Sequence, residues 1–401
     1  SAAKLGAAQL ALDMLEKGTR TRDSYRIADE LDNLGANISA ASSSDMSLVR
    51  LRATSANLKP SLDLLADVVL NPGFPQDQFA IEKQRRLAQL GQEKATATSL
   101  ATRVMPVLLY GADHAYGKPG LGYEKTVNSL TRDDLMQWHG AWFKPGSATV
   151  IVAGDTTLDK LMPALEAAFG SWKPGKAPAK NLATVARSAS KKVYLIDKPD
   201  APQSTIVAAH VSETSGQPED LALEPVIQNF GGMATSRMNR NLRLDKHWSY
   251  GTQGQMVSLR GQRTFLTIAP VQTDKTKESM LEVAKEIRGV AGERPLVGEE
   301  YNSIMRNMTS RLPGRFATLA SLEAAAVSSV NLNLPDDHWS RYGANMRALN
   351  EAQLAQAGKK FVRPDEVVWL VIGDVRKIEK GVRELNLGEV VKLDADGNVL
   401  P

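Results

Sequence analysis

An arginine and a tyrosine near the middle of the chain have the chemistry to bind an oxygen-rich ligand. Arg243 and Tyr250 lie seven residues apart in the stretch FGGMATSRMNRNLRLDKHWSYG, residues 230–251. A guanidinium fork and a phenol hydroxyl both donate hydrogen bonds to carbonyl, carboxylate or oxyanion oxygens. The Gly pair that opens the stretch, Gly231 and Gly232, lets a backbone approach closely or turn tightly. The pattern also fits a simpler interpretation, a loop followed by a solvated basic helix face.

Other catalytic and metal-binding motifs are absent from the sequence. No histidine lies within five residues of another, so none seeds a local metal site, and each is interpreted as a surface or loop residue. The chain has no cysteine, which excludes a disulfide framework, a thiolate metal site and a cysteine nucleophile. Neither a G-x-S-x-G elbow nor a G-x-x-x-x-G-K-[ST] phosphate loop occurs. The histidines are His114, His139, His210, His247 and His338.

The bulk composition indicates an ordinary globular protein. Its 401 residues are enough for two or more domains, and 42% hydrophobic with 23% charged residues is typical of soluble chains. The net charge of +4 argues neither for nor against a nucleic-acid partner. Because no dense Lys/Arg run with interleaved aromatics appears, no such partner is expected. No apolar run approaches about 18 residues, so we expect no transmembrane segment. The opening residues carry charges and predict a helix, not a signal peptide. The lack of cysteine favours a bacterial periplasm or cell envelope over the cytoplasm.

Hydrophobic periodicity and turn residues predict alternating helices and short strands. Helices are expected at residues 3–17, 24–34, 60–70, 75–98, 99–110, 131–142 and 158–169. Strands are expected at residues 36–42, 46–54, 148–153 and 192–197. The segment KPGKAPAK, residues 173–180, has too few apolar residues to pack and predicts a linker.

An internal repeat divides the chain. The segment from Leu130 to Asp155 resembles the segment from Leu349 to Asp374, with one constant offset of 219 residues over 26 positions. A constant offset over this length indicates two copies of one α+β unit. The second copy opens with a strand around Val193, whose counterpart falls before residue 1. We therefore expect the first copy to lack its opening strands.

The arginine–tyrosine stretch resembles the second-domain segment of the M16 zinc peptidases, the family of pitrilysin, insulin-degrading enzyme and mitochondrial processing peptidase. In that family the pair reaches a zinc site on a different domain. The resemblance implies that Arg243 and Tyr250 are catalytic by completing a partner's site, and that nearby residues contact substrate. The implied substrate-binding residues are Gly231, Gly232, Ser236 and Arg237. The alternative for Tyr250 is a buried aromatic at the start of a strand. The match lies at Gly231-Gly232, Ser236-Arg237-Met238-Asn239, Leu242-Arg243 and Tyr250.

The N-terminal helix resembles the zinc-binding helix of the same family but lacks its ligands. Active members carry H-x-x-E-H there; the two histidines hold zinc and the glutamate takes a proton from the activated water. Gln9 and Asp13 occupy the histidine positions, and Leu12 occupies the general-base position. On a later helix Glu82 matches the first acid of the family pattern, but the ligand position holds Gln89. An amide oxygen is a weak, neutral ligand for zinc. No metal or other cofactor is therefore expected in this chain.

By resemblance the fold class is α+β, with two homologous domains that each pack an antiparallel-rich sheet against helices, as in M16 and LuxS-like metallohydrolases. The first M16-like domain is predicted at residues 1–180 and the second at 181–401. A preserved Arg/Tyr pair beside a degenerate zinc motif resembles the non-catalytic subunit of a heterodimeric M16 peptidase. The resemblance implies a catalytic partner that carries H-x-x-E-H and zinc, and extended peptides as substrates.

Two other hypotheses stay open. The chain is alternatively a purely structural scaffold, like the core subunits of respiratory complexes that resemble this family, although a scaffold needs neither Arg243 nor Tyr250. It is alternatively an autonomous metallopeptidase with a rebuilt metal site, which the substitutions of the zinc motif argue against. A homodimer of the chain alone is compatible with each hypothesis.

Overall fold

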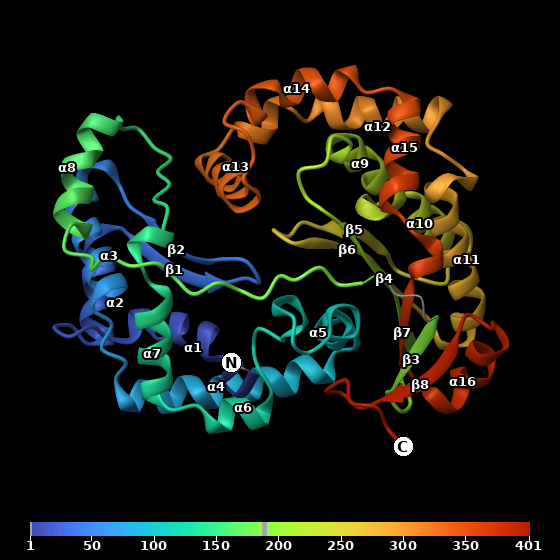
Figure 1. Cartoon of the computed structure of the whole chain (residues 1–401), viewed down its shortest axis with the longest axis horizontal. Helices are drawn as coiled ribbons and strands as arrows, with labels where there is room; N and C mark the ends of the chain where they lie inside the picture. Colours follow the sequence, from blue (N-terminus) through green and yellow to red (C-terminus); the bar gives the residue numbers. More distant parts are fainter. Residues whose placement is uncertain (1, 187–190) are drawn as a thin grey trace. The chain divides into compact units, whose positions relative to one another are not determined.

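The chain divides into two compact units in a computed structural model that describes residues 2–186 and 191–401 (Figure 1). The first unit contains residues up to 92 and residues 118–181; the second contains residues 93–117 and 182–401. The predicted boundary near residue 180 differs from this division only in the segment 93–117 and by one residue. That segment carries α5, which packs against strands of the second unit.

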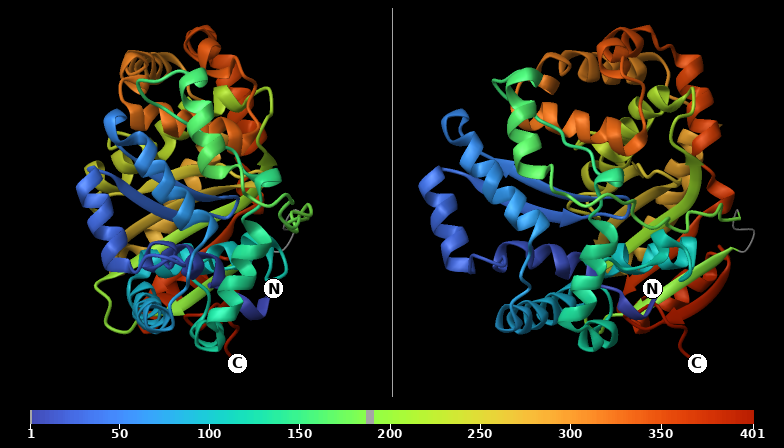
Figure 2. Two further views of the ribbon diagram at one scale, coloured as in Figure 1. Left: turned by 90° about the vertical axis from the view of Figure 1, so that its left-hand side faces the viewer. Right: turned by 60° about the vertical axis from the view of Figure 1, so that its left-hand side comes forward.

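The first unit is mainly helical around one β-hairpin. Strands β1 (Asn37–Ser42) and β2 (Ser47–Arg52) pair antiparallel, with Ile38 opposite Leu51. Apolar side chains of α1, α2 and α3 pack against one side of the hairpin. Figure 2 shows the ribbons of the hairpin and its neighbouring helices. The helices are α1 (Ala7–Asp13), α2 (Ser24–Leu34), α3 (Leu58–Leu70), α4 (Gln76–Ala95), α6 (Glu124–Ser129), α7 (Arg132–Trp142) and α8 (Leu158–Phe169).

The N-terminal segment is broken, whereas the sequence predicted one helix over residues 3–17. Short 3-10 turns at Ala2–Lys4 and Leu15–Lys17 flank α1. Gly6 causes the break: it adopts φ +94°, and a Cβ there would lie 2.7 Å from the carbonyl oxygen of Leu121. Only glycine tolerates this backbone conformation and this close approach, so the helix starts after it.

Residues 148–153 are not a strand, so that prediction was wrong. Their counterparts, 219 positions later, are residues 367–372. All but the first of these lie in β7 (Val368–Gly373), which is buried along its whole length between two neighbouring strands. No described residue of the first unit pairs with the segment, and Val150 and Val152 are 57% and 47% exposed. A β-branched run favours a strand only where partner strands complete the ladder and the core.

The second unit is built on a six-stranded mixed sheet of order β5-β6-β4-β7-β3-β8. Strands β5, β6, β4 and β7 pair antiparallel, while β3 runs parallel to β7 and β8. The long strands β4 and β6 cross the unit in Figure 2. The remaining strands are β3 (Lys192–Asp197), β4 (Gln203–Thr214), β5 (Gln253–Val257), β6 (Gln262–Gln272) and β8 (Glu389–Leu393).

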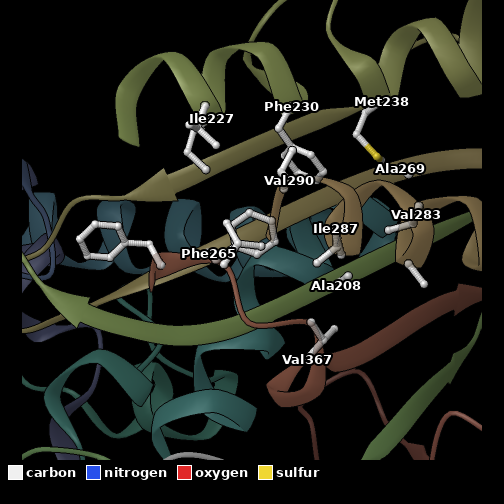
Figure 3. Close-up of a cluster of buried hydrophobic side chains, with 14 of the residues drawn as sticks. Ala208, Ile227, Phe230, Met238, Phe265, Ala269, Val283, Ile287, Val290 and Val367 are labelled. Carbon is white, nitrogen blue, oxygen red and sulfur yellow. The ribbon is translucent and has the colours of Figure 1, made fainter. Parts of the chain in front are cut away.

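Helices cover both faces of this sheet. Figure 3 shows the larger core, where the ring of Phe230 packs against that of Phe265 in β6 and Met238 lies beside Ala269. The opposite face packs against α5. The helices of the unit are α5 (Ala97–Tyr110), α9 (Asp220–Ile227), α10 (Arg237–Asn239), α11 (Thr276–Arg288), α12 (Gly298–Ser310), α13 (Leu319–Leu332), α14 (His338–Ala348), α15 (Glu351–Phe361) and α16 (Val375–Glu384).

The internal repeat is visible in local structure. Helix α7 and helix α15 begin and end at positions 219 residues apart, and the 3-10 turns that follow, Pro145–Ser147 and Pro364–Glu366, keep the same offset. Thr131 and Asn350 cap the two helices, each in a reciprocal capping box. The two copies diverge only afterwards, where one continues into β7. None of the helices among the described residues is both long and apolar enough to cross a membrane.

Candidate functional site

The side chains of Arg243 and Tyr250 are exposed and without partners in the described part of the chain. Arg243 lies on a π-helical segment, Arg240–Asp245, that continues α10. Tyr250 is 90% exposed in the loop that follows. Neither side chain makes a hydrogen bond, ion pair or ring contact to another described residue. Tyr250 is therefore not the buried aromatic that was the alternative prediction.

Backbone hydrogen bonds bring the two residues together. The carbonyl of Leu242 accepts the N–H groups of Trp248, at 2.9 Å, and Ser249, at 3.2 Å. Because Leu242 precedes Arg243 and Ser249 precedes Tyr250, the loop brings the backbone at Tyr250 back toward that at Arg243. His247 makes the reversal with a left-handed φ of +57°, and its Nδ1 lies 3.1 Å from the Arg243 carbonyl oxygen. A positive φ at a non-glycine residue costs free energy, which the surrounding hydrogen bonds offset.

A buried amide fixes the far end of the loop. Asn239 Nδ2 donates to the carbonyls of Met233, at 2.9 Å, and Thr252, at 3.1 Å, while its Oδ1 accepts the Thr252 N–H at 2.7 Å. Asn239 and Thr252 are both buried. One side chain therefore joins the segment before α10 to the loop that carries Tyr250.

Hydrogen bonds to the end of β6 hold the same loop. The Ser249 hydroxyl lies 2.5 Å from the carbonyl oxygen of Pro270 and accepts the Gly251 N–H at 3.1 Å. The N–H of Gln272 donates to the Trp248 carbonyl at 2.9 Å. The residues on both sides of Tyr250 are thus held by the sheet, which leaves a free phenol on an ordered backbone.

Arg237, predicted to bind substrate, is buried and fully engaged inside the second unit. Its Nη1 donates to the carbonyl of Arg294 at 2.6 Å, and its Nη2 donates to that of Pro295 at 3.2 Å. The guanidinium also forms a two-point ion pair with Glu300. Burial acts to raise the pKa of Glu300. The hydrogen bonds and positive charge of Arg237 act in the opposite direction and outweigh it, so the pKa of Glu300 is lowered. In this structure Arg237 joins α10 to the start of α12.

The other three predicted substrate-binding residues differ in exposure. Ser236 is buried and caps α10, since its hydroxyl accepts the Asn239 N–H at 3.4 Å. Gly231 is buried against β5, and a Cβ there would lie 2.4 Å from the backbone nitrogen of Gly254. Only Gly232 is exposed. Substrate contact by these residues stays a prediction, and the structure gives Ser236 and Gly231 packing roles.

The degenerate zinc motif forms a closed polar cluster in the first unit. The Gln9 Oε1 accepts the N–H of Ser42 in β1 at 3.1 Å, and its Nε2 donates to the Asp13 Oδ1 at 3.2 Å. The other oxygen of Asp13 forms an ion pair with Arg86 of α4. Each polar group of the motif that lies inside the unit is therefore paired with another residue of this chain.

These residues do not fit a zinc ion. Leu12 is 1% exposed in a hydrophobic cluster, and Gln89 points outward as an exposed side chain. Of the four motif positions Gln9, Leu12, Asp13 and Gln89, only Asp13 offers a charged ligand. Its carboxylate is already paired with Arg86. Among the described residues, no group of three or more His, Cys, Asp and Glu side chains could hold a metal ion.

Sequence reasoning missed Asn239, Ser249 and Arg86. Asn239 belongs to the quoted S-R-M-N motif, so the motif signalled it without giving its task. Ser249 and Arg86 carry no local signal, because their partners lie 21 and 73 residues away along the chain.

Family models match most of the chain. Residues 1–109 match the model described as insulinase, peptidase family M16, and residues 129–307 match the peptidase M16 inactive domain. An uncharacterized zinc protease from Rickettsia felis is 29% identical over 163 residues, which cover 41% of this chain and 39% of that protein. The chain thus aligns with less than half the length of that relative.

Solved structures agree with this fold. The crystal structure of a peptidase M16 inactive domain from Pseudomonas fluorescens has a TM-score of 0.86 at 21% identity, over 92% of this chain and 88% of that chain. A chain of complex III2 from Candida albicans, solved with Inz-5 bound, has a TM-score of 0.78 at 16% identity, over 96% and 90%. Identities this low indicate a common fold only.

Proposed function

Because the chain belongs to the M16 peptidase family, we propose that it is the non-catalytic, substrate-binding subunit of a heteromeric zinc peptidase. It supplies Arg243 and Tyr250 to the zinc site of a partner subunit that carries H-x-x-E-H. The observation that carries the proposal is the free state of these two side chains on a loop that Asn239 and Ser249 hold in place.

The chemistry follows from the two free donors. Attack of water on a peptide carbonyl places negative charge on the carbonyl oxygen, and the Tyr250 hydroxyl donates a hydrogen bond to that oxygen. The Arg243 guanidinium binds a neighbouring substrate carbonyl. The partner's zinc supplies the activated water. Because the loop is already ordered, these donors need little reorganisation when substrate arrives, which is the condition for transition-state stabilisation.

The test is the turnover of a quenched, unstructured peptide by this chain mixed with candidate H-x-x-E-H subunits from the same genome. Loss of one oxyanion donor costs about 3 kcal/mol, so Tyr250→Phe lowers kcat on the order of a hundredfold. Tyr25→Phe is the matched control, since Tyr25 is 85% exposed on α2 and lies in the other unit. Equal turnover of the two variants would exclude this role for Tyr250.

A structural scaffold is the second candidate, because a chain of complex III2 from Candida albicans has the same fold. A scaffold needs the partner interface but not the phenol. Co-elution of the two subunits on a sizing column, unchanged by Tyr250→Phe, together with unchanged turnover, supports the scaffold. Co-elution with a large loss of kcat supports the substrate-binding subunit.

A further inference from the structure

The buried Arg86 lies beside the degenerate zinc motif of the first unit. The inference drawn from it is independent of the proposed function. We propose that the Arg86 guanidinium takes the place of a metal ion: it supplies the positive charge opposite Asp13 and joins α4 to α1. Zinc is thereby excluded by a cation of the chain itself, as well as by the loss of ligands.

The geometry of the cluster supports this role. Arg86 is 4% exposed, and its Nη2 bonds to the Asp13 Oδ2, whose side chain is 16% exposed. The Asp13 Oδ1 accepts from Gln9, and Gln9 in turn accepts the Ser42 N–H. An unbroken series of bonds therefore runs from α4 through α1 to β1. A metal ion bound at the family's ligand positions would join two of these elements, α1 and α4.

The same arrangement blocks a metal ion electrostatically. Both oxygens of Asp13 already accept a bond, so a divalent cation bound to this carboxylate would lie beside Gln9 and the Arg86 guanidinium. It would also meet the electrostatic repulsion of the positively charged guanidinium. A buried charge cannot leave its partner without a large desolvation penalty, which holds Arg86 in place.

Neighbouring charges on α4 are neutralised in the same way. Glu82, one turn before Arg86, is buried and pairs with Lys17, at 3.4 Å, and with Arg85. Gln89, about one turn after Arg86, is exposed. The described acids of α1 and α4 that flank the motif, Asp13 and Glu82, thus each face a cation of this chain and are not free to bind metal.

Restoring the ligands tests the proposal. The full chain is prepared with Gln9→His, Asp13→His and Gln89→Glu, once with Arg86 kept and once with Arg86→Met. Zinc bound after dialysis is then quantified. We expect about one zinc ion per chain only in the Arg86→Met background, and at least about tenfold weaker zinc binding where the guanidinium remains. Equal zinc binding in the two backgrounds overturns the proposal.

A double-mutant cycle decides the matter if the ligand variants do not fold by circular dichroism. Arg86→Met alone leaves Asp13 unpaired and is expected to lower the midpoint of thermal unfolding by at least about 5 °C. Asp13→Asn in the Arg86→Met background restores part of that loss. The control Gln89→Met, on the same helix but exposed, leaves the midpoint unchanged. Additive effects of the two substitutions, or zinc bound to the wild-type chain at this cluster, contradict the proposal.

Discussion

The polar cluster of α1 and the Arg243–Tyr250 loop differ in whether their polar side chains are paired with other residues of the chain. In the first unit, Asp13 accepts a hydrogen bond from Gln9 and forms an ion pair with Arg86, so both of its oxygens are engaged inside the unit. In the second unit, the hydrogen bonds are made by the residues around Arg243 and Tyr250, and those two side chains stay free. Pairing stabilises a fold, while free donors on an ordered loop are available to a ligand. The difference indicates a structural role for the first region and supports the recognition role that is proposed for the second.

The largest contrast is expected between two arginines of one segment. Arg237→Ala removes bonds to two backbone carbonyls and to Glu300, and we expect a loss of about 3 kcal/mol in the free energy of unfolding, because buried acceptors are left unpaired. Arg243→Ala removes an exposed side chain and should change stability by less than about 0.5 kcal/mol. Urea unfolding of both variants measures this. Similar losses would show that Arg243 is also structural.

The stability of the core that contains His210 is expected to fall in acid. His210 stacks on Phe265, which packs on Phe230 at the start of the glycine pair. Burial lowers the pKa of His210 to about 4, against the partly opposing hydrogen bond to Val211. The unfolded chain therefore binds a proton that the folded chain refuses between pH 6.5 and 4, so stability falls as pH falls through this window, by up to on the order of 3 kcal/mol.

Unfolding measured from pH 7.5 to 4 checks this slope. The variant His210→Phe, which cannot titrate, should reduce the slope across the window. The assignment to His210 fails if the slope of the His210→Phe variant equals that of the wild type.

Asn239 should link stability to the geometry of the open loop. Asn239→Ala leaves the buried Thr252 N–H without its acceptor, and we expect a cost of about 2 kcal/mol. Asn239→Asp keeps the acceptor and should cost less. Hydrogen exchange at the Thr252 amide reports the loop directly: faster exchange is expected in Asn239→Ala, and unchanged exchange would mean that other contacts hold the loop.

The smallest expected effect is that of zinc on the wild-type chain. A ligand stabilises a protein only when it binds the folded state, so added zinc or chelator should shift the unfolding midpoint by less than about 1 °C. A larger rise at micromolar zinc would mean that the α1 cluster, or another group of residues, holds the metal after all.

The sequence predicted the local parts of this structure well. The repeat offset of 219 residues holds to the residue through α7 and α15 and their caps, because capping boxes and periodic apolar residues act over a few positions. The strand predicted at residues 148–153 was wrong, because strand formation there depends on neighbours that are distant in sequence. The break at Gly6 likewise depends on Leu121, over a hundred residues later.

The candidate site shows the same limit. The resemblance identified Arg243 and Tyr250, and the structure adds that they are free. The resemblance did not distinguish the buried Arg237 from the exposed Arg243. Arg237 is held by Glu300, which lies 63 residues away along the chain and gives no local signal. Nor did the substitutions at Gln9 and Asp13 reveal that Arg86 would close the cluster.

The most direct test of the central claim is peptidase activity on a quenched unstructured peptide, with zinc quantified, for the chain alone and for the chain mixed with an H-x-x-E-H subunit. The account predicts no zinc and no turnover for the chain alone, and turnover in the mixture that exceeds that of the partner alone. Zinc and chelator-sensitive turnover in the chain alone would contradict it.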